Sequence, residues 1–297
     1  MVIGATEMII LAAFMKTFCF IALQYLLPQH ALSRLAGFVA ETKNTWIKQR
    51  FINWFIRRYN VDMSIAAEPD ASTYQNFNEF FTRPLADGQR PITDDANGIA
   101  CPADGCISQI GLINNGHIFQ AKGQEYSLLE LVGGDIDIAK QFVDGSFATV
   151  YLSPKDYHRV HMPLGGTLQT MIHVPGDLFS VNETTASNVP RLFARNERVV
   201  ALFKTDQGPM AVILVGAMIV ASIETVWAGL VTPKKKQIQT THYQQADDIH
   251  LNKGDEMGRF KLGSTAIVLF GKEAAKWSDE LEANSPVMMG EKMGDIL

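Results

Sequence analysis

Short apolar segments broken by turn residues make up most of this chain from about Ile99 onward, and they restrict the folds it can adopt. The segments are rich in β-branched residues or alternate apolar with polar residues, and Gly, Pro, Asn or Asp separates them. Because few segments of helical length lie between them, βαβ winding is disfavoured and a β-rich, mainly antiparallel core is predicted. The candidate strands are residues 106–110, 117–121, 147–152, 166–174, 199–203, 210–216, 219–226 and 264–270.

The front of the chain follows a helical pattern instead. From His30 to Tyr59 apolar residues recur at helical spacing with Lys and Arg between them, which predicts an amphipathic helix or helix pair. A short capped helix is expected within residues 71–85, and the polar residues 234–255 are expected to form a surface loop. The chain is therefore assigned to the α+β class, with N-terminal helices in residues 1–62 and a β-rich domain in residues 63–297.

Basic charge is concentrated in the same front region. Residues 1–60 contain seven Lys or Arg against two Glu, a local charge of +5 in a chain whose net charge is -5. Aromatic and Leu residues beside Lys and Arg suit the interface of an anionic bilayer, so a membrane-associating segment is predicted. A helix pair packed on its own core is the alternative. The net negative charge argues against nucleic acid as a partner.

Two apolar runs precede the amphipathic region, at residues 8–15 and 17–27, and Pro28 closes the second. Neither run alone reaches the roughly 20 apolar residues that a membrane-spanning helix needs. The start of the chain is not basic and no small-residue cleavage site follows, which disfavours a signal peptide. Three cysteines without a C-x-x-C pair predict neither a disulfide framework nor a zinc cluster, and they fit a reducing, cytoplasm-facing location.

Three places in the sequence could carry chemistry: Asp104 in PADG, the two histidines His158 and His161, and Ser264 in LGST. Each motif alone is weak evidence for a functional site, because Asp-Gly is common in turns and Gly-Ser-Thr is a common tripeptide. The histidines follow a predicted strand, where an offset of three residues directs side chains to opposite faces. That spacing argues against one metal ion bound by both histidines. Two separate roles for the histidines, or purely structural ones, stay open.

Asp, His and Ser together allow a Ser-His-Asp hydrolase acting on external substrates, because such triads are defined by geometry and not by sequence order. No G-x-S-x-G motif surrounds Ser264, so the usual presentation of a hydrolase nucleophile is missing. Ser264 is instead expected at the first residue of a buried strand, where it could attack the carbonyl that precedes it. A non-catalytic, membrane-attached lipid-binding protein is the other alternative.

Several longer motifs resemble one known family. The chain is similar to the bacterial phosphatidylserine decarboxylases in order from about Tyr25 to Phe270, and the tetrapeptide LGST is the most specific match. The matching segments are FNEFFTRPL (77–85), PADGCISQIG (102–111), YLSPKDYHRVHMP (151–163), VPGDLFSVN (174–182), LFARNERV (192–199), VGAMIVASIETVWAG (215–229) and GRFKLGST (258–265).

The resemblance implies that the chain cuts itself between Gly263 and Ser264. The products would be a β chain of residues 1–263 and an α chain of residues 264–297. The resemblance also implies that Ser264 becomes a covalent pyruvoyl group, the only cofactor, with no metal. Gly263 has no side chain to obstruct attack on its carbonyl.

The same resemblance implies roles for the other candidates. His161 would take the proton of the Ser264 hydroxyl during self-cleavage, and Asp104 would orient the imidazole and stabilise its charged form. His158 would return a proton to the substrate carbon after carbon dioxide has left.

The implied reaction converts phosphatidylserine to phosphatidylethanolamine and carbon dioxide, as a step of phospholipid biosynthesis. The implied partners are phosphatidylserine, an anionic membrane surface, the α and β chains of one precursor and a second copy in a homodimer. A peripheral location on the cytoplasmic face of the cell membrane is expected, since an enzyme acting on a headgroup must reach the interface.

Overall fold

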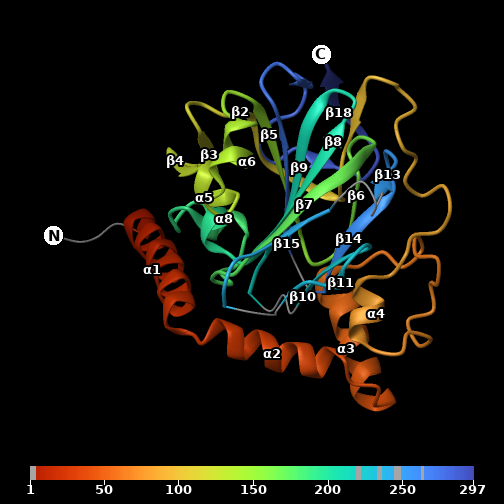
Figure 1. The fold of residues 1–297 in the computed structure, drawn as a ribbon. Coiled ribbons are helices and arrows are strands. Elements are labelled where there is room, and N and C mark those ends of the chain that lie inside the picture. Colours follow the sequence, from red (N-terminus) through yellow and green to blue (C-terminus); the bar gives the residue numbers. More distant parts are fainter. Residues whose placement is uncertain (1–4, 219–221, 233–235, 244–248, 262–263) are drawn as a thin grey trace.

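The computed structural model describes residues 5–218, 222–232, 236–243, 249–261 and 264–297. Figure 1 shows strands at the centre of the molecule, with the first helices of the chain along the left side and below. Helices at the front and a mainly antiparallel core behind them confirm the predicted α+β class.

The largest sheet carries Ser264 on its central strand. That strand, β15 (Ser264–Phe270), pairs antiparallel with β9 (Gly208–Gly216) on one side and β5 (Ser146–Leu152) on the other, and all seven of its residues are buried. A strand covered on both faces must be apolar throughout, as the run from Ala266 to Phe270 is. The sheet order is β12 (Gln239–His242), β7 (Gly166–Val174), β8 (Arg198–Thr205), β9 (Gly208–Gly216), β15, β5 (Ser146–Leu152), β2 (Gly105–Leu112) and β17 (Pro286–Val287), and β13 (His250–Leu251) also pairs with β7.

A smaller sheet covers one face of the large one. Its order is β11 (Gly229–Leu230), β10 (Ser222–Thr225), β14 (Glu256–Lys261) and β6 (Arg159–His161). Val160 and Phe260 from the small sheet and Leu214 and Ala266 from the large sheet belong to one buried hydrophobic cluster. The two sheets therefore enclose a common core, as in a β-sandwich.

The opposite face of the large sheet is covered by a hairpin and short helices, which form a second buried cluster with it. These elements are β3 (His117–Ala121), β4 (Gln124–Ser127), α5 (Leu128–Leu131), α6 (Ile136–Lys140), α7 (Glu183–Ala186) and α8 (Leu192–Arg195). A third sheet joins β1 (Gly98–Ala100), β18 (Lys292–Ile296) and β16 (Ala275–Trp277).

The front of the chain forms α1 (Ala5–Leu26), α2 (Gln29–Ala40), α3 (Thr45–Tyr59) and the short α4 (Phe77–Phe81). The predicted helix pair is confirmed in α2 and α3, and the Asn44 side chain caps α3 by accepting hydrogen bonds from two backbone amides. The two apolar runs of the leader form one helix through Lys16, and Pro28 separates it from α2. Within the described residues, none of the helices combines the length and the hydropathy that crossing a bilayer requires.

Differences from the expected elements are local. The helix expected within residues 71–85 is confined to α4, because Asn76 caps its start and the chain turns before that residue. The expected surface loop at 234–255 is wrong in part, since it contains β12 and β13, which pair with the edge of β7. Residues 234–235 and 244–248 of this expected loop lie outside the described part of the chain. Of the strand expected at 219–226, residues 222–225 form β10, and residues 219–221 lie outside the described part of the chain.

The division at residue 62 stays a prediction. A third hydrophobic cluster joins Ile52 and Phe55 of α3 to Phe77, Phe80 and Phe81 of α4. The N-terminal helices are thus packed against the segment that leads into the β-rich core.

Candidate active site

Ser264 starts the central strand as a fully buried residue. It pairs with Leu152 of β5 and with Gly216 of β9. Its hydroxyl oxygen is buried and has no hydrogen-bond partner among the described residues. Burying a hydroxyl that forms no hydrogen bond costs folding free energy, so a serine at this position calls for a chemical explanation. Residues 262 and 263, and therefore the predicted cleavage partner Gly263, lie outside the described part of the chain.

The Ser264 side chain faces the core between the two sheets. Alternate residues of a strand share a face, and Ala266 belongs to the cluster that both sheets enclose. Gly216, its neighbour on β9, has no side chain to fill the adjoining position. A β-carbon built on Gly216 would lie 4.0 Å from the side chain of Ile223 in the small sheet. The serine hydroxyl therefore lies at one end of the sandwich, on the side of the small sheet.

His158 directly precedes β6 of the small sheet and faces the same interior. Its carbonyl accepts a hydrogen bond from the amide of Phe260 at 3.0 Å, just before the chain leads to residues 262–264. Val160 and Met162, which follow it at intervals of two, belong to the cluster between the sheets. The imidazole is fully buried, and the Phe81 ring lies 4.0 Å from it, centroid to centroid.

The surroundings of His158 fix its protonation. Its Nδ1 lies 2.7 Å from the backbone carbonyl of Asp156, which can only accept, so the ring proton belongs on Nδ1. Nε2 then carries the lone pair, and it is buried without a partner among the described residues. Burial lowers the pKa of His158 to about 3, because the charged ring would lose its hydration. The residue is a neutral base at physiological pH.

This burial should make folding sensitive to acid. Below pH 6.5 the unfolded chain binds a proton at His158 that the folded chain does not take up until about pH 3, so stability falls over that window. At pH 5 the loss attributable to this residue is about 2 kcal/mol. Urea unfolding of the uncut Ser264→Ala chain should show this loss between pH 7 and pH 5. Adding His158→Gln should remove it, and an unchanged pH dependence would contradict the assignment.

His161 lies on the other side of β6. It follows His158 at an offset of three residues, so along an extended chain the two side chains point to opposite faces. Its Nδ1 lies 2.8 Å from the Gly254 carbonyl, and the Tyr157 hydroxyl lies 3.1 Å from its Nε2. Burial lowers the pKa of His161 as well. Both ring nitrogens have partners, and neither partner is Ser264 or Asp104.

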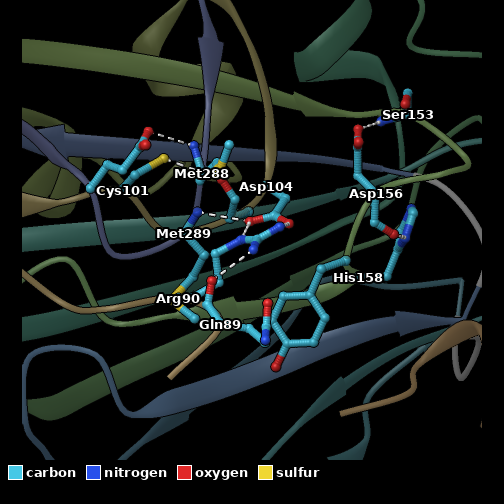
Figure 2. A network of polar contacts seen from close by, with 12 residues as sticks. Gln89, Arg90, Cys101, Asp104, Ser153, Asp156, His158, Met288 and Met289 are labelled. Carbon is cyan, nitrogen blue, oxygen red and sulfur yellow. Dashed lines mark hydrogen bonds and ion pairs between the residues drawn. The ribbon is translucent and has the colours of Figure 1, made fainter. Parts of the chain in front are cut away.

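Asp104 is held by other groups. Arg90 donates to both of its carboxylate oxygens, from Nε at 2.8 Å and from Nη2 at 2.6 Å, and the Met289 amide donates at 2.9 Å. Figure 2 shows the two side chains face to face, with Met289 beside them. The expectation that Asp104 orients His161 is therefore not met, because a bidentate ion pair and a backbone amide occupy the carboxylate.

The local fold explains where Asp104 points. A β-carbon on the following Gly105 would lie 2.1 Å from the Tyr151 carbonyl oxygen, so only glycine allows this approach to β5. Asp104 and Asp156 line one hollow of about 590 Å³, together with Arg90 and Lys155. The Asp156 carboxylate accepts a hydrogen bond from the Ser153 amide at 2.7 Å, and burial raises the pKa of Asp156. Figure 2 shows Asp156 beside His158.

Sequence reasoning missed three neighbours of these residues: Arg90, Asp156 and Phe81. Asp156 lies within the motif YLSPKDYHRVHMP and Phe81 within FNEFFTRPL, so the family resemblance includes both segments. It does not predict that either residue contacts His158. Arg90 lies outside every motif singled out above. Only the fold shows that it neutralises Asp104 across a separation of 14 residues.

Comparisons with known proteins identify the family of the chain. A family model described as phosphatidylserine decarboxylase matches residues 77–295, and one described as PSD matches residues 19–60. The phosphatidylserine decarboxylase proenzyme of Pseudomonas entomophila (strain L48) is 63% identical over 281 residues, which are 94% of this chain and 98% of that protein. The proenzyme of Pseudomonas aeruginosa (strain LESB58) is 64% identical over 274 residues, or 92% of this chain and 95% of that protein. The chain therefore belongs to the phosphatidylserine decarboxylase family.

Proposed function

We propose that this protein decarboxylates phosphatidylserine to phosphatidylethanolamine, using a pyruvoyl group that it makes from Ser264 by self-cleavage after Gly263. The observation that carries the proposal is the unpaired Ser264 hydroxyl, buried at the start of the central strand. The name proenzyme, borne by relatives 63% and 64% identical to this chain, fits a chain that must be processed. A serine at this position is placed to react with its own backbone and poorly placed for external substrates.

Self-cleavage needs a base for the Ser264 proton, since an unactivated hydroxyl is a poor nucleophile. His158 meets the requirements: it faces the same interior as Ser264, it is neutral, and its Nε2 lone pair is free among the described residues. Loss of that proton lets the serine oxygen attack the Gly263 carbonyl, which converts the amide to an ester. Removal of the Ser264 α-proton then breaks the bond between the β-carbon and the ester oxygen, which releases the Gly263 carboxylate and leaves dehydroalanine at the start of the second chain. Dehydroalanine rearranges to an imine, and water hydrolyses the imine to the ketone with loss of ammonia. We therefore assign to His158 the role that the family resemblance gave to His161.

The residues around Ser264 also fit the group formed there. A ketone at this position would remove the unpaired hydroxyl, and it would leave His158 Nε2 directed into the same interior. When formed, the pyruvoyl group supplies an electron sink, which accepts the electron pair of the bond between the substrate α-carbon and its carboxylate group as that bond breaks. His158 then has a second task, because the α-carbon that has lost carbon dioxide must regain a proton. Its Nε2 carries a lone pair, so it must take up a proton from water before it passes one to that carbon. Its proposed role as proton donor is thus retained.

Asp104 and His161 are assigned supporting roles. Asp104 binds Arg90 and the Met289 amide, and so connects the start of β2 to the segment after β17. His161 connects β6 to Gly254 through its Nδ1. Both contacts hold elements that carry the reacting residues, which is a positioning function.

The proposed activity is tested by incubating purified protein with phosphatidylserine labelled at the serine carboxyl carbon. Release of labelled carbon dioxide, matched by formation of phosphatidylethanolamine and abolished by hydroxylamine, is the expected result. Capture of an active chain by a serine-directed reagent would instead identify a hydrolase. An uncut chain that binds the lipid without releasing carbon dioxide would identify a lipid-binding protein.

The N-terminal helices support a peripheral membrane location. They expose apolar side chains that a soluble surface would normally bury, and the Arg50 guanidinium lies 4.2 Å from the Trp46 ring centroid. Arg50, Arg57 and Arg58 line a hollow of about 400 Å³ with Trp54, and none of the three forms an ion pair within the described residues. The exposed apolar residues include Phe14, Phe18, Leu23, Leu26, Leu35, Phe38, Trp46 and Trp54. Unpaired arginines beside exposed aromatic rings fit an anionic bilayer surface.

Replacing Arg50, Arg57 and Arg58 together with glutamine should weaken binding to phosphatidylserine vesicles. Each basic residue near such a surface contributes about 1 kcal/mol, so the partition coefficient should fall roughly 100-fold. A triple replacement of the exposed Lys140, Lys204 and Lys272 with glutamine serves as the charge-matched control. Vesicle sedimentation measures both, and equal losses in the two triple variants would contradict a specific helical surface.

The cytoplasmic face of the cell membrane and the homodimer remain parts of this proposal. The exposed helices support a membrane surface as a partner. Light scattering of the detergent-solubilised protein, which gives the mass of the protein component, tests for two copies.

A further inference from the structure

The loop of residues 176–180 connects β7 to the segment that carries α7, and it lies between the N-terminal helices and the end of the large sheet that holds Ser264. In Figure 1 the junction of α1 and α2 lies below the strands at this end of the molecule. The 176–180 loop belongs to the motif VPGDLFSVN, to which the proposed reaction gives no role.

Glutamine side chains from the helices bind the backbone of this loop. Gln29 Oε1 accepts a hydrogen bond from the Leu178 amide at 2.6 Å, and Gln24 Oε1 accepts one from the Ser180 amide at 2.8 Å. Gln29 also donates to the Gln24 carbonyl at 2.8 Å, which links the two glutamines. Neither loop amide has a backbone acceptor within the described residues. The helices thus supply the partners that the folded loop requires.

Aromatic contacts reinforce the same junction. Tyr25 of α1 meets Phe179 of the loop edge to face, with ring centroids 4.8 Å apart. The Arg195 guanidinium lies 5.4 Å from the Tyr25 ring centroid and 4.8 Å from that of Phe179. Such pairs add to the apolar burial and fix the side-chain orientation. The loop is therefore held on its outer side by several independent contacts.

On its inner side the loop contacts the strand next to Ser264. The fully buried Asn196 side chain donates to the carbonyls of Phe179, at 2.8 Å, and of Gly216, at 2.9 Å. A Leu178 methyl carbon lies 3.6 Å from where a β-carbon of Gly216 would stand. Gly216 is the direct strand partner of Ser264. Leu178 consequently covers the position beside the reacting residue.

We infer that Gln24 and Gln29 are positioning residues of the reaction, which act through Leu178 to form one wall of the site for the serine headgroup. The inference rests on the decarboxylase activity proposed above. It gives the N-terminal helices two separate tasks: their exposed face binds the lipid surface, and Gln24 and Gln29 hold the wall against which the headgroup lies. Weakening the second task should leave the first intact.

The test compares Gln29→Ala and the double variant Gln24→Ala, Gln29→Ala with the wild-type chain. Gln49→Ala, on α3 and bonded to Asn53, removes a glutamine that does not contact the loop and is the matched control. Gln29→Glu keeps the acceptor for the Leu178 amide and is the rescue variant. For each processed protein we would measure vesicle binding, kcat and KM on phosphatidylserine in mixed micelles, and amide exchange at residues 178 and 180.

The double variant should be fully cut and bind vesicles like the wild type, while kcat/KM falls roughly 10-fold or more, since two hydrogen bonds are lost. Amide exchange at residues 178 and 180 should accelerate by a similar factor. Gln29→Glu should retain at least half of the wild-type kcat/KM, and the Gln49→Ala control should match the wild type.

Wild-type kcat/KM in the double variant, or a loss fully explained by weaker vesicle binding, would overturn the inference. Unchanged exchange at residues 178 and 180 would overturn it independently of any activity. A wild-type chain that releases no carbon dioxide would instead refute the proposed function, which separates the two failures.

Discussion

Replacing Ser264 with alanine is expected to leave the chain in one piece and without any decarboxylase activity. The variant lacks the oxygen that must attack the Gly263 carbonyl, so neither the cut nor the ketone can form. Because the hydroxyl is buried without a partner, its removal should not destabilise the fold. Denaturing gel electrophoresis checks the cut, and carbon dioxide release checks the activity.

Thr265→Val is the matched control for this replacement. Thr265 is the next residue of β15, fully buried, and its hydroxyl also lacks a partner among the described residues. It faces the other side of the sheet, away from His158, because successive residues of a strand alternate. We expect this variant to be cut and active. A Ser264→Ala chain that is cut at the same bond would refute the proposed route.

His158→Gln is expected to slow self-cleavage by about 10²- to 10⁴-fold, the usual contribution of a positioned general base. Glutamine keeps a similar size and a polar end, but it cannot take the serine proton. Any fraction that is cut should form phosphatidylethanolamine slowly, because the residue proposed to deliver a proton after carbon dioxide has left is lost as well. Time courses of cleavage and of phosphatidylethanolamine formation measure the two steps separately.

His161→Gln separates the two histidines. It removes the contacts with Gly254 and Tyr157 but leaves the interior that His158 shares with Ser264. We expect this chain to be cut at least 10 times faster than His158→Gln. The opposite order, with His161→Gln uncut and His158→Gln cut, would return the base of self-cleavage to His161 and confine His158 to decarboxylation.

Much of the core could be predicted because strand patterns are local. The strands at 117–121, 166–174 and 264–270 were placed at their observed bounds, and apolar alternation bounded by turn residues is enough for that. Polar edge strands such as β12 and β13 lack this signal, because they are stabilised by pairing with β7 and not by burial of their own side chains.

The candidate site was predictable in its members but not in its contacts. Ser264, His158 and Asp104 were identified from motifs, and the opposite directions of the two histidines follow from strand geometry. The partner of Asp104 was not identified, because Arg90 reaches it only after two segments of the chain are brought together. The contact of Gln24 with Ser180 spans 156 residues, and no local pattern carries such information.

The mass spectrum of the purified, active protein tests the central claim most directly. We expect two polypeptides that meet at Gly263 and Ser264, with the smaller one lighter by one ammonia than a serine-started chain and modified by hydroxylamine. A single intact polypeptide with full decarboxylase activity would contradict the claim that the Ser264 hydroxyl is consumed to make the reactive ketone.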